Sequence, residues 1–324
     1  MRAIVMHRPG GPDVLGLEEV PTPSPGPGEV LLRVEAVGVS YHETPMRAGV
    51  YDMPVPLPTV FGFEAAGEVT QAGEGVDPAW VGRRVVSMNL DTAGSYAEYT
   101  AVPVTAATPV PAELSMVDAV AVALQGSVAL CLVRAADLAP GGAALVEVAS
   151  GSIGGYLVTL LRARGAGRIV ATAGGPDRRD RALELGADAV LDHTDPDWPD
   201  QVRDALDGAT LDAAFESIGG DAPRRYLDAM TPGSGRIIFY GLLSHQPPAI
   251  TPLDLLPRGL TLTGCGGLTA WADKVRAARA EALDLAATGA LRPAVDSVLP
   301  LADAPEAHRR IESRRTTGKI VLTP

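Results

Sequence analysis

The feature that most constrains the fold is a glycine-rich turn at residues 149–155, which separates an apolar run from a helical pattern. The apolar run covers residues 143–148, and from residue 153 to residue 161 apolar side chains recur at the spacing of a helix face. A second apolar run follows at residues 168–172. This order predicts a strand, a tight turn, a helix and a second strand parallel to the first, which together form a βαβ unit.

The same alternation of apolar runs and helical stretches continues through residues 123–264 and predicts six strands. The runs are residues 143–148, 168–172, 189–191, 211–215, 236–240 and 260–263. Strands that alternate with helices predict an α/β fold, here a Rossmann doubly wound parallel sheet. The run at 260–263 would end this sheet, and because an exposed sheet edge can pair with a second copy, we expect a homodimer.

Residues 1–122 differ in composition and pattern: they contain many Val, Gly and Pro residues, and their apolar runs are short and separated by turn residues. Prolines and glycines such as those of residues 21–28 neither continue a helix nor pair within a central strand. We therefore expect a compact β-rich domain here. A charged helix from about residue 271 leads to two further apolar segments, at 298–301 and 319–322, and we assign residues 265–324 to the same domain.

The glycine-rich turn is the strongest candidate for a dinucleotide-binding site. Its expected cofactor contacts are Ala149, Ser150, Gly151, Ser152, Ile153 and Gly154, with Ala149 in place of the first glycine of the fingerprint. A turn with so little side chain lets backbone N–H groups and the helix N-terminus approach a pyrophosphate. A glycine turn can also simply join a strand to a helix, but the surrounding βαβ unit favours binding.

The end of the second strand indicates which dinucleotide binds. An acid about 20 residues past the glycines would hold the ribose 2′-OH of NADH. This place instead holds Thr172 and Gly174, and Arg178 and Arg179 follow. An arginine can bind a 2′-phosphate through paired, charge-assisted hydrogen bonds. The sequence therefore favours NADPH; the alternative is that these arginines belong to a solvated helix start.

Charge and composition exclude several classes of function. The chain has 27 Lys and Arg against 39 Asp and Glu, a net charge of −12, which argues against a nucleic-acid partner. Cys131 and Cys265 are its only cysteines, too few for a disulfide framework or a four-cysteine zinc site. We find neither a signal-peptide core nor an apolar run of about 18 residues, so we expect a soluble, cytoplasmic protein with no membrane partner.

Beyond these patterns, the whole chain resembles the medium-chain dehydrogenase/reductase superfamily, and within it the zinc-free quinone oxidoreductases and zeta-crystallin-like reductases. The residues that carry the resemblance are 38–43 with 47–51, 62–69, 94–99, 149–154, 185–188 and 308–319. The resemblance implies that the β-rich domain is GroES-like and catalytic. It also implies an NADPH-dependent reductase that acts on a small molecule and forms a homodimer.

In zinc-dependent alcohol dehydrogenases, which the chain resembles more distantly, a Cys and a His bind the catalytic zinc at the places held here by Ser40 and Phe63. Phenylalanine cannot bind zinc and no cysteine replaces the missing thiolate, so we expect no metal site. Hydride transfer without a Lewis acid suits a quinone or a conjugated enone better than an unactivated alcohol.

The resemblance also assigns residues to the active site. It places Tyr51 beside the nicotinamide as proton donor or substrate-positioning hydroxyl, with Ser40 on the same wall; Tyr51 could equally only shield the cofactor while solvent supplies the proton. It places Arg178 on the 2′-phosphate, His193 near the adenosine and Arg314 near the same phosphate or the cleft. The nicotinamide side would be lined by Tyr240, Gly241 and Leu242. His193 and Arg314 are alternatively surface side chains without a ligand.

The sequence leaves three functions open. The first is an NADPH-dependent reductase of a quinone or an α,β-unsaturated carbonyl, and the second is an enoyl-thioester reductase or natural-product tailoring reductase. The third is an NADPH-binding protein without relevant turnover, because a fold does not fix a function. One residue fits none of these: Glu147 interrupts the apolar central strand, where a buried carboxylate needs a partner or a raised pKa, and the sequence names no partner.

Overall fold

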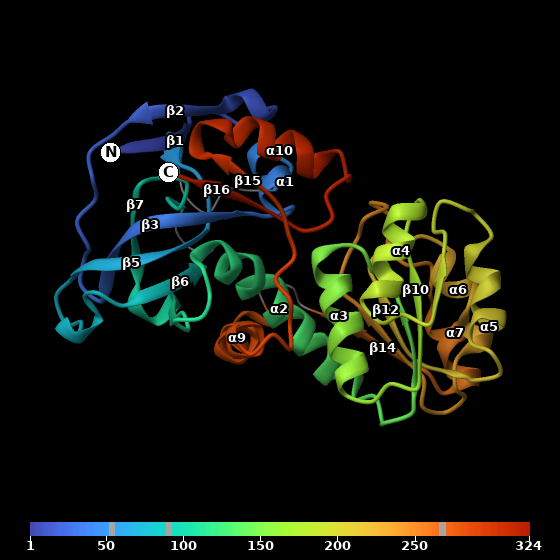
Figure 1. Ribbon diagram of the computed structural model, residues 1–324. Coiled ribbons are helices and arrows are strands. Elements are labelled where there is room, and N and C mark those ends of the chain that lie inside the picture. The colour runs from blue at the N-terminus through green and yellow to red at the C-terminus, as the bar shows by residue number, and fades with distance from the viewer. Residues whose placement is uncertain (52–55, 89–92, 266–269) are drawn as a thin grey trace. The chain divides into compact units, whose positions relative to one another are not determined.

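The computed structural model describes residues 1–51, 56–88, 93–265 and 270–324. They form two compact units, the first of Met1–Leu124 with Arg279–Pro324 and the second of Gln125–Ala278 (Figure 1). The chain passes from one unit to the other within helix α2 (Met116–Ala136) and again within helix α9 (Ala272–Ala287). The domain boundaries expected from the sequence, after residues 122 and 264, remain a prediction.

The second unit is built on a six-stranded sheet in which neighbouring strands are parallel. Its strands are β9 (Ala143–Val146), β10 (Arg168–Thr172), β11 (Ala189–Leu191), β12 (Leu211–Glu216), β13 (Arg236–Phe239) and β14 (Thr261–Gly264). They lie in the order β11-β10-β9-β12-β13-β14, which is the strand order of a Rossmann fold. The predicted parallel sheet is confirmed.

Helices connect these strands. They are α3 (Ser152–Ala163), α4 (Pro176–Glu184), α5 (Val202–Ala205), α6 (Ala222–Arg225) and α7 (Pro252–Leu255). All four residues of β9 are buried, as expected for a central parallel strand with both faces covered. One apolar cluster contains Leu145, Val170 and Ile237 from the strands and Trp198 and Val202 from the helical segments. This packing fixes the sheet edge from which the loops emerge.

The first unit is β-rich. A three-stranded sheet has the order β2-β1-β4, and a seven-stranded sheet has the order β15-β16-β3-β5-β6-β8 with β7 also paired to β3. The strands are β1 (Arg2–Met6), β2 (Leu15–Glu19), β3 (Glu29–Val39), β4 (Thr59–Val60), β5 (Glu64–Ala72), β6 (Arg84–Met88), β7 (Tyr99–Pro103), β8 (Ala107–Pro109), β15 (Val295–Pro300) and β16 (Lys319–Thr323). Helices α1 (Glu43–Ala48) and α10 (Ala304–Glu312) also belong to this unit.

The pairing of β16 with β3 positions the candidate site. The two strands are antiparallel, and Ile320 lies opposite Val39. The next pair in this register is Lys319 with Ser40, the residue that directly follows β3. Two segments that are far apart in the sequence therefore meet at one point of the sheet.

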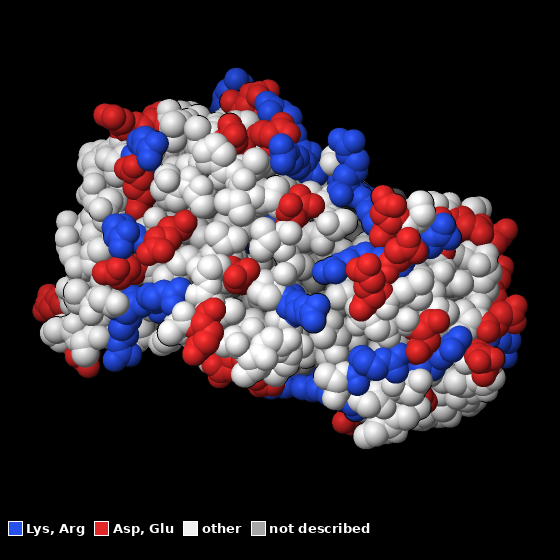
Figure 2. All heavy atoms as spheres, viewed as in Figure 1, with Lys and Arg blue, Asp and Glu red and all other residues white. Residues whose placement is uncertain are grey.

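Charged side chains are spread over the surface of both units. On the face drawn in Figure 2, Lys and Arg lie among Asp and Glu rather than gathering in one basic area. Surface ion pairs such as Arg225 with Asp200 and Arg258 with Asp228, both at 2.5 Å, follow the same mixed pattern. The absence of a nucleic-acid partner stays a prediction from the net charge.

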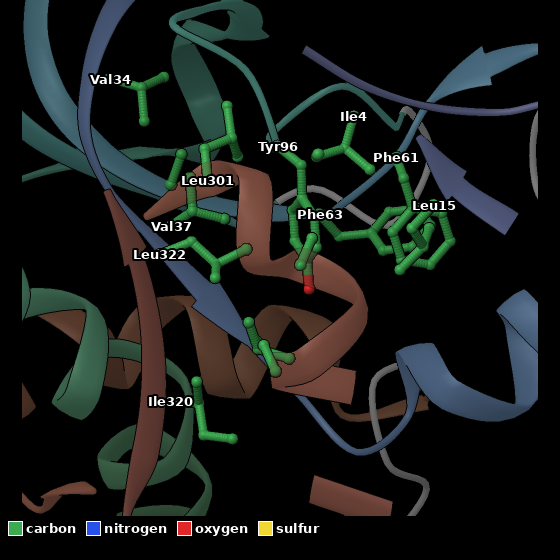
Figure 3. Packing of buried hydrophobic residues seen from close by; sticks show 14 of the residues in the cluster. Ile4, Leu15, Val34, Val37, Phe61, Phe63, Tyr96, Leu301, Ile320 and Leu322 are labelled. Atoms are coloured by element: carbon green, nitrogen blue, oxygen red, sulfur yellow. The ribbon is translucent and has the colours of Figure 1, made fainter. Parts of the chain in front are cut away.

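Aromatic rings pack beneath the end of β3 in the first unit. Figure 3 shows Phe61, Phe63 and Tyr96 close to the aliphatic side chains of Ile4 and Leu15, in a cluster that also contains Val37 and Ile320. The rings of Phe61 and Tyr96 meet edge to face with centroids 5.4 Å apart. Phe63 is 1% exposed. The strand that leads to Ser40 is thus anchored in a buried apolar cluster, which includes Val37 and Val39.

Helix α2 corrects one expectation from the sequence. It has 21 residues and is long and apolar enough to cross a membrane, although we found no apolar run of that length. Polar residues such as Gln125 and Ser127 interrupt the run, which hid it. However, 78% of its most apolar window is buried inside the protein. The core helix of a soluble protein has the same composition, so α2 is weak evidence for a membrane span.

Candidate active site

The predicted cofactor residues of the second unit lie in turns at the carboxyl edge of its parallel sheet. The glycine turn follows β9, Thr172 ends β10, His193 comes after β11 and Tyr240 comes after β13. In open α/β sheets, ligands bind outside this edge, where the strand order switches direction. Here the switch lies at β9, which has β10 on one side and β12 on the other.

The glycine turn is tight because its backbone folds back on itself. Val148 has a positive φ of 54°, and its carbonyl oxygen accepts a hydrogen bond from the Gly151 N–H at 3.0 Å. The Ala149 N–H donates to the Thr172 carbonyl oxygen at 2.9 Å and ties the turn to β10. A Cβ atom at Gly154 would lie 2.3 Å from the Val148 oxygen, so only glycine fits there.

Helix α3 begins directly at this turn. Its N-cap residue, Gly151, carries no capping side chain. The first N–H groups of a helix have no partner within the helix, and together with the helix dipole they favour an anion such as a phosphate. Ser150 is buried, whereas Ser152 and Ile153 are half-buried. The turn therefore offers backbone donors at a surface that a pyrophosphate can reach.

Thr172, Gly174, Arg178 and His193 form a second group on this edge. The Thr172 hydroxyl lies 3.4 Å from His193 Nδ1, and a Cβ atom at Gly174 would lie 3.0 Å from His193 Nε2. Burial lowers the pKa of His193, and the nearby charge of Arg178 acts in the same direction. His193 is therefore neutral at pH 7, and Arg178 supplies positive charge at this end of the site.

Sequence reasoning missed one charged residue here. We looked for an acid only after β10, but Asp192 directly follows β11, close to His193. Hydrogen bonds from the Thr194 hydroxyl and N–H, at 2.7 and 3.0 Å, hold the pKa of Asp192 below its usual range, and Arg179 adds to this. The Asp-X-Thr spacing typical of a side-chain turn is the signal that could have revealed it.

Tyr240, Gly241 and Leu242 lie against the turn that follows β12. The Tyr240 N–H donates to the Glu216 carbonyl oxygen at 3.0 Å, and a Cβ atom at Gly241 would lie 2.9 Å from the Ser217 carbonyl oxygen. Leu242 is 42% exposed. The backbone of this segment is thus held close to its neighbour while the leucine remains available for contacts.

Two buried carboxyl groups hold the turn after β12, and they supply the missing partner of Glu147. Glu147 directly follows β9 and Glu216 ends the neighbouring strand β12, and both are fully buried. Glu147 accepts hydrogen bonds from the N–H groups of Ser217 and Ile218 at 2.9 and 3.0 Å, and Glu216 accepts one from Gly219. Burial raises the pKa of both groups. Two carboxylates this close and this buried repel each other, which also raises the pKa of Glu147.

In the first unit, Ser40 belongs to a buried cluster that the sequence did not reveal. The Lys319 ammonium donates hydrogen bonds to Ser40 Oγ and Glu64 Oε2, each at 2.6 Å. Ser40, Glu64 and Lys319 are 3%, 1% and 2% exposed. Gly38, in the central strand β3, leaves room for the ion pair, because a Cβ atom there would lie 2.3 Å from Glu64 Oε2 and 2.7 Å from Lys319 Cε. We name Ser40, Glu64 and Lys319 the lysine cluster.

A second buried network begins at the backbone of Ser40. Glu43 accepts hydrogen bonds from the Ser40 N–H at 2.7 Å and from the Tyr96 hydroxyl at 2.9 Å. The Tyr96 hydroxyl also lies 3.2 Å from His308 Nε2, and His308 Nδ1 lies 3.4 Å from the Arg47 guanidinium. Burial lowers the pKa of His308 to about 3 and raises the pKa of Glu43 to about 7. Both groups can therefore be uncharged at neutral pH.

We expect Glu43→Gln to change how stability depends on pH. Because its pKa is raised from 4.5 to about 7, Glu43 binds a proton more tightly in the folded protein than in the unfolded chain. This contribution to the free energy of unfolding, about 3 kcal/mol, is fully present below pH 4.5 and is lost as the pH rises through 7. Glutamine stays neutral and lacks it. Urea unfolding at pH 5 and pH 8 should show the wild type losing about 2 to 3 kcal/mol more than the variant; equal losses would contradict the prediction.

The residues at the zinc position of the alcohol dehydrogenases do not fit a metal ion. The Phe63 ring packs against Phe61, with centroids 5.9 Å apart. Ser40 Oγ already accepts from an ammonium group, which repels a second cation. In the parts of the chain that the structure describes, no group of three or more His, Cys, Asp or Glu side chains could hold a metal. The side chains gathered at this position carry hydroxyl, ammonium and carboxyl groups.

Tyr51 and Arg314 lie apart from these buried clusters, in the first unit. Tyr51 follows α1 and is 56% exposed, and its N–H donates to the Pro45 carbonyl oxygen at 3.3 Å. Arg314 follows α10, is exposed and has a positive φ of 55°. Of the two catalytic candidates, Ser40 is the one held in a buried network. The roles of Tyr51 and Arg314 stay predictions.

Comparisons with known proteins identify the family to which this chain belongs. The family model described as "Alcohol dehydrogenase GroES-like domain" matches residues 26–112, and the model described as "Zinc-binding dehydrogenase" matches residues 185–322. The chain is 32% identical to a 2-haloacrylate reductase of Burkholderia sp, over 99% of this chain and 98% of that protein. It is 33% identical to a probable quinone oxidoreductase of Schizosaccharomyces pombe, over 98% and 96% respectively. The structure of Escherichia coli quinone oxidoreductase complexed with NADPH superposes with a TM-score of 0.88 at 28% identity, over 100% of both chains.

A Rossmann sheet with a glycine turn, joined to a GroES-like unit, defines a class of dinucleotide-dependent oxidoreductases. Since relatives more than 30% identical span nearly the whole chain, it belongs to the medium-chain dehydrogenase/reductase superfamily, in the quinone oxidoreductase branch. The family and the fold class inferred from the sequence are confirmed.

Proposed function

We propose that the protein is an NADPH-dependent, zinc-independent reductase that transfers hydride to a quinone or an α,β-unsaturated carbonyl compound. The observation that carries this proposal is the lysine cluster, in which an ammonium group occupies Ser40 Oγ where zinc-dependent relatives have a metal ligand. A substrate with a conjugated carbonyl accepts hydride without a Lewis acid. The reductase and oxidoreductase names of the relatives support the same chemistry.

In this proposal NADPH supplies the hydride, and each predicted site residue has a stated role. The backbone of Ala149, Ser150, Gly151, Ser152, Ile153 and Gly154 binds the pyrophosphate. Arg178 binds the 2′-phosphate, with Thr172, Gly174 and His193 beside the adenosine, and Tyr240, Gly241 and Leu242 line the nicotinamide side. Ser40 and Tyr51 contact the small-molecule substrate, and Arg314 reaches the cofactor. A structural relative solved with NADPH supports this choice of dinucleotide.

The test is turnover of the purified protein with saturating NADPH and a panel of quinones, enones and acyl thioesters, followed by loss of dihydronicotinamide absorbance. We expect oxidation of NADPH with quinones or enones, at a rate that a zinc chelator leaves unchanged. Turnover confined to thioesters would instead favour the enoyl-thioester or tailoring reductase. Tight NADPH binding without any oxidation would favour a binding protein.

We expect Arg178→Ala to weaken NADPH binding about 10- to 100-fold while leaving NADH binding unchanged, because charge-assisted bonds to the 2′-phosphate are lost. Nicotinamide fluorescence titrations measure both affinities. The matched control is Arg181→Ala on the same helix, since Arg181 pairs with Glu184 at 3.5 Å on the surface. If wild-type protein binds NADH as tightly as NADPH, the assignment of Arg178 fails.

Two further features belong to the proposal. The first is a homodimer formed through β14, which ends the strand order of the parallel sheet. Leu253 and Leu256, shortly before β14 in the chain, are 79% and 77% exposed, which supports an apolar contact there.

The second feature is the location of the protein, which we propose is soluble in the cytoplasm. The mostly buried helix α2 and the net charge of −12 support this location.

A further inference from the structure

Two hydrogens of the lysine cluster, one on the Lys319 ammonium and one on the Ser40 hydroxyl, have no acceptor among the described residues. An ammonium group has three donors and a hydroxyl has one donor and two acceptor sites. Lys319 directs two of its donors at Ser40 Oγ and Glu64 Oε2. Because Ser40 Oγ accepts in this contact, its own hydrogen must point elsewhere. No described residue accepts the hydrogen of the Ser40 hydroxyl, so this hydroxyl can still donate a hydrogen bond to a ligand.

Several buried polar atoms near Ser40 also lack a hydrogen-bond partner among the described residues. Three buried atoms, His42 Nε2, Glu43 Oε1 and Glu64 Oε1, have no hydrogen-bond partner among the described residues. Glu43 accepts a hydrogen bond from the Ser40 N–H and Glu64 accepts one from Lys319, so both carboxyl groups lie beside the lysine cluster. Buried polar atoms in native proteins are nearly always satisfied, by protein, water or ligand. The unpaired atoms around Ser40 therefore indicate a position that a polar group of a water molecule or a ligand can occupy.

A hydroxyl that accepts a hydrogen bond from a cation becomes a better donor and a better acid. An oxygen that gains negative charge during a reaction is stabilised most by donors that are already fixed in place. Lys319 and Ser40 are fixed, since both are buried and Lys319 is anchored to Glu64 on the other side of Gly38. Tyr51, the other candidate donor, is 56% exposed.

We propose that Lys319 and Ser40 form a proton relay in which Ser40 donates to the carbonyl oxygen of the substrate and Lys319 restores the Ser40 proton. This inference rests on the proposed function, because it requires a quinone or enone whose carbonyl meets Ser40. Ser40 is then a catalytic residue, and Lys319 and Glu64 are positioning residues that act through it.

The atoms and electrons of this step balance. As hydride adds to the electrophilic carbon, the substrate gains two electrons from NADPH, and the π pair moves onto the carbonyl oxygen. The Ser40 O–H bond breaks while an O–H bond forms on that oxygen. A Lys319 N–H bond breaks while Ser40 regains its hydrogen. Once the product has left, a hydronium ion from solvent returns a proton through Ser40 to the Lys319 amine, and the enol product of an enone tautomerises to the saturated carbonyl.

Steady-state kinetics of variants, with NADPH and the best quinone or enone of the panel, tests the relay. Ser40→Ala leaves the Lys319–Glu64 pair in place and should lower kcat about 100-fold. The KM for NADPH should stay within about twofold of the wild-type value, because Ser40 does not bind the cofactor tightly in this scheme. The matched control is Ser87→Ala, since Ser87 is also buried in the same sheet and its hydroxyl has no partner among the described residues.

A double-mutant cycle separates the relay from a merely structural role. Lys319→Met is combined with Glu64→Gln so that no unpaired charge is left buried. If Lys319 acts only through Ser40, this pair lowers kcat about as much as Ser40→Ala, and the triple variant is no slower than Ser40→Ala alone. Independent, multiplying effects would overturn the relay. Wild-type kcat in Ser40→Ala would overturn it even if the Lys319 variant fails to fold.

The two proposals fail in different ways. If the wild-type protein oxidises NADPH with the substrate panel but Ser40→Ala is equally fast, the relay is wrong and the proposed function stands. If wild-type protein reduces none of the panel, the proposed function is wrong and the relay falls with it.

Discussion

Gly38→Ala is expected to lower the free energy of unfolding by about 3 to 5 kcal/mol, the usual cost of breaking a buried ion pair. The added methyl group would lie 2.3 Å from Glu64 Oε2, 2.7 Å from Lys319 Cε and 2.7 Å from Val120 Cγ1. Three side chains from different elements cannot all move away, because each is packed in the core. Separation of Lys319 from Glu64 also leaves both charges buried without a partner. Urea unfolding followed by circular dichroism measures the loss.

The control for Gly38 is Gly11→Ala in the same unit. A Cβ atom at Gly11 meets nothing within 4 Å, and its φ of −68° suits any residue. Both variants lose the same backbone flexibility in the unfolded chain, so their difference isolates the steric effect. If Gly38→Ala and Gly11→Ala unfold at the same urea concentration, the prediction is contradicted, and the Lys319–Glu64 ion pair does not pass over Gly38.

Gly154→Ala is expected to weaken NADPH binding at least about 100-fold, because a shift of about 1 Å in a positioned site can cost that much. Its Cβ atom would lie 2.3 Å from the Val148 carbonyl oxygen and 2.8 Å from Ala149 Cα. Both contacts are to backbone, so the turn itself must open and its N–H groups move away from the pyrophosphate. Fluorescence titration with NADPH measures the affinity.

Gly155→Ala is the matched control for this turn. Its Cβ atom would approach Leu185 Cδ1 at 3.1 Å, the end of a flexible side chain that can give way. Alanine also favours a helix interior over glycine by about 1 kcal/mol. We therefore expect Gly155→Ala to keep its NADPH affinity and its stability. Equal affinities in the two variants would show that the turn does not bind the pyrophosphate.

Much of the second unit could be predicted from the sequence because its signals are local. A parallel strand buried on both faces appears as a continuous apolar run, and the next turn or helix marks where it ends. The expected and observed strands therefore differ by at most two residues, as for β9, expected at 143–148 and observed at Ala143–Val146. The strand order follows from connection rules that need no distant contact.

The site of the first unit could not be predicted in the same way, because its contacts join distant segments. Ser40 directly follows β3, whereas Glu64 and Lys319 begin β5 and β16, and only the register of β16 on β3 places Lys319 beside Ser40. A lysine near the start of a strand ordinarily suggests an exposed side chain. Glu147 shows the same limit: the sequence marked it as anomalous, but its partner Glu216 became visible only when β9 and β12 were neighbours.

The distance between these partners along the chain also sets an order of assembly. Lys319 is separated from Ser40 by 279 residues and from Glu64 by 255. The strands of the Rossmann sheet, in contrast, all lie between Ala143 and Gly264, so that sheet can form while β3 still lacks β16. A growing chain emerges from the ribosome N-terminal end first, and its units fold as they become complete. The Rossmann unit of this protein should thus fold first during synthesis, and the β-rich unit should be completed last.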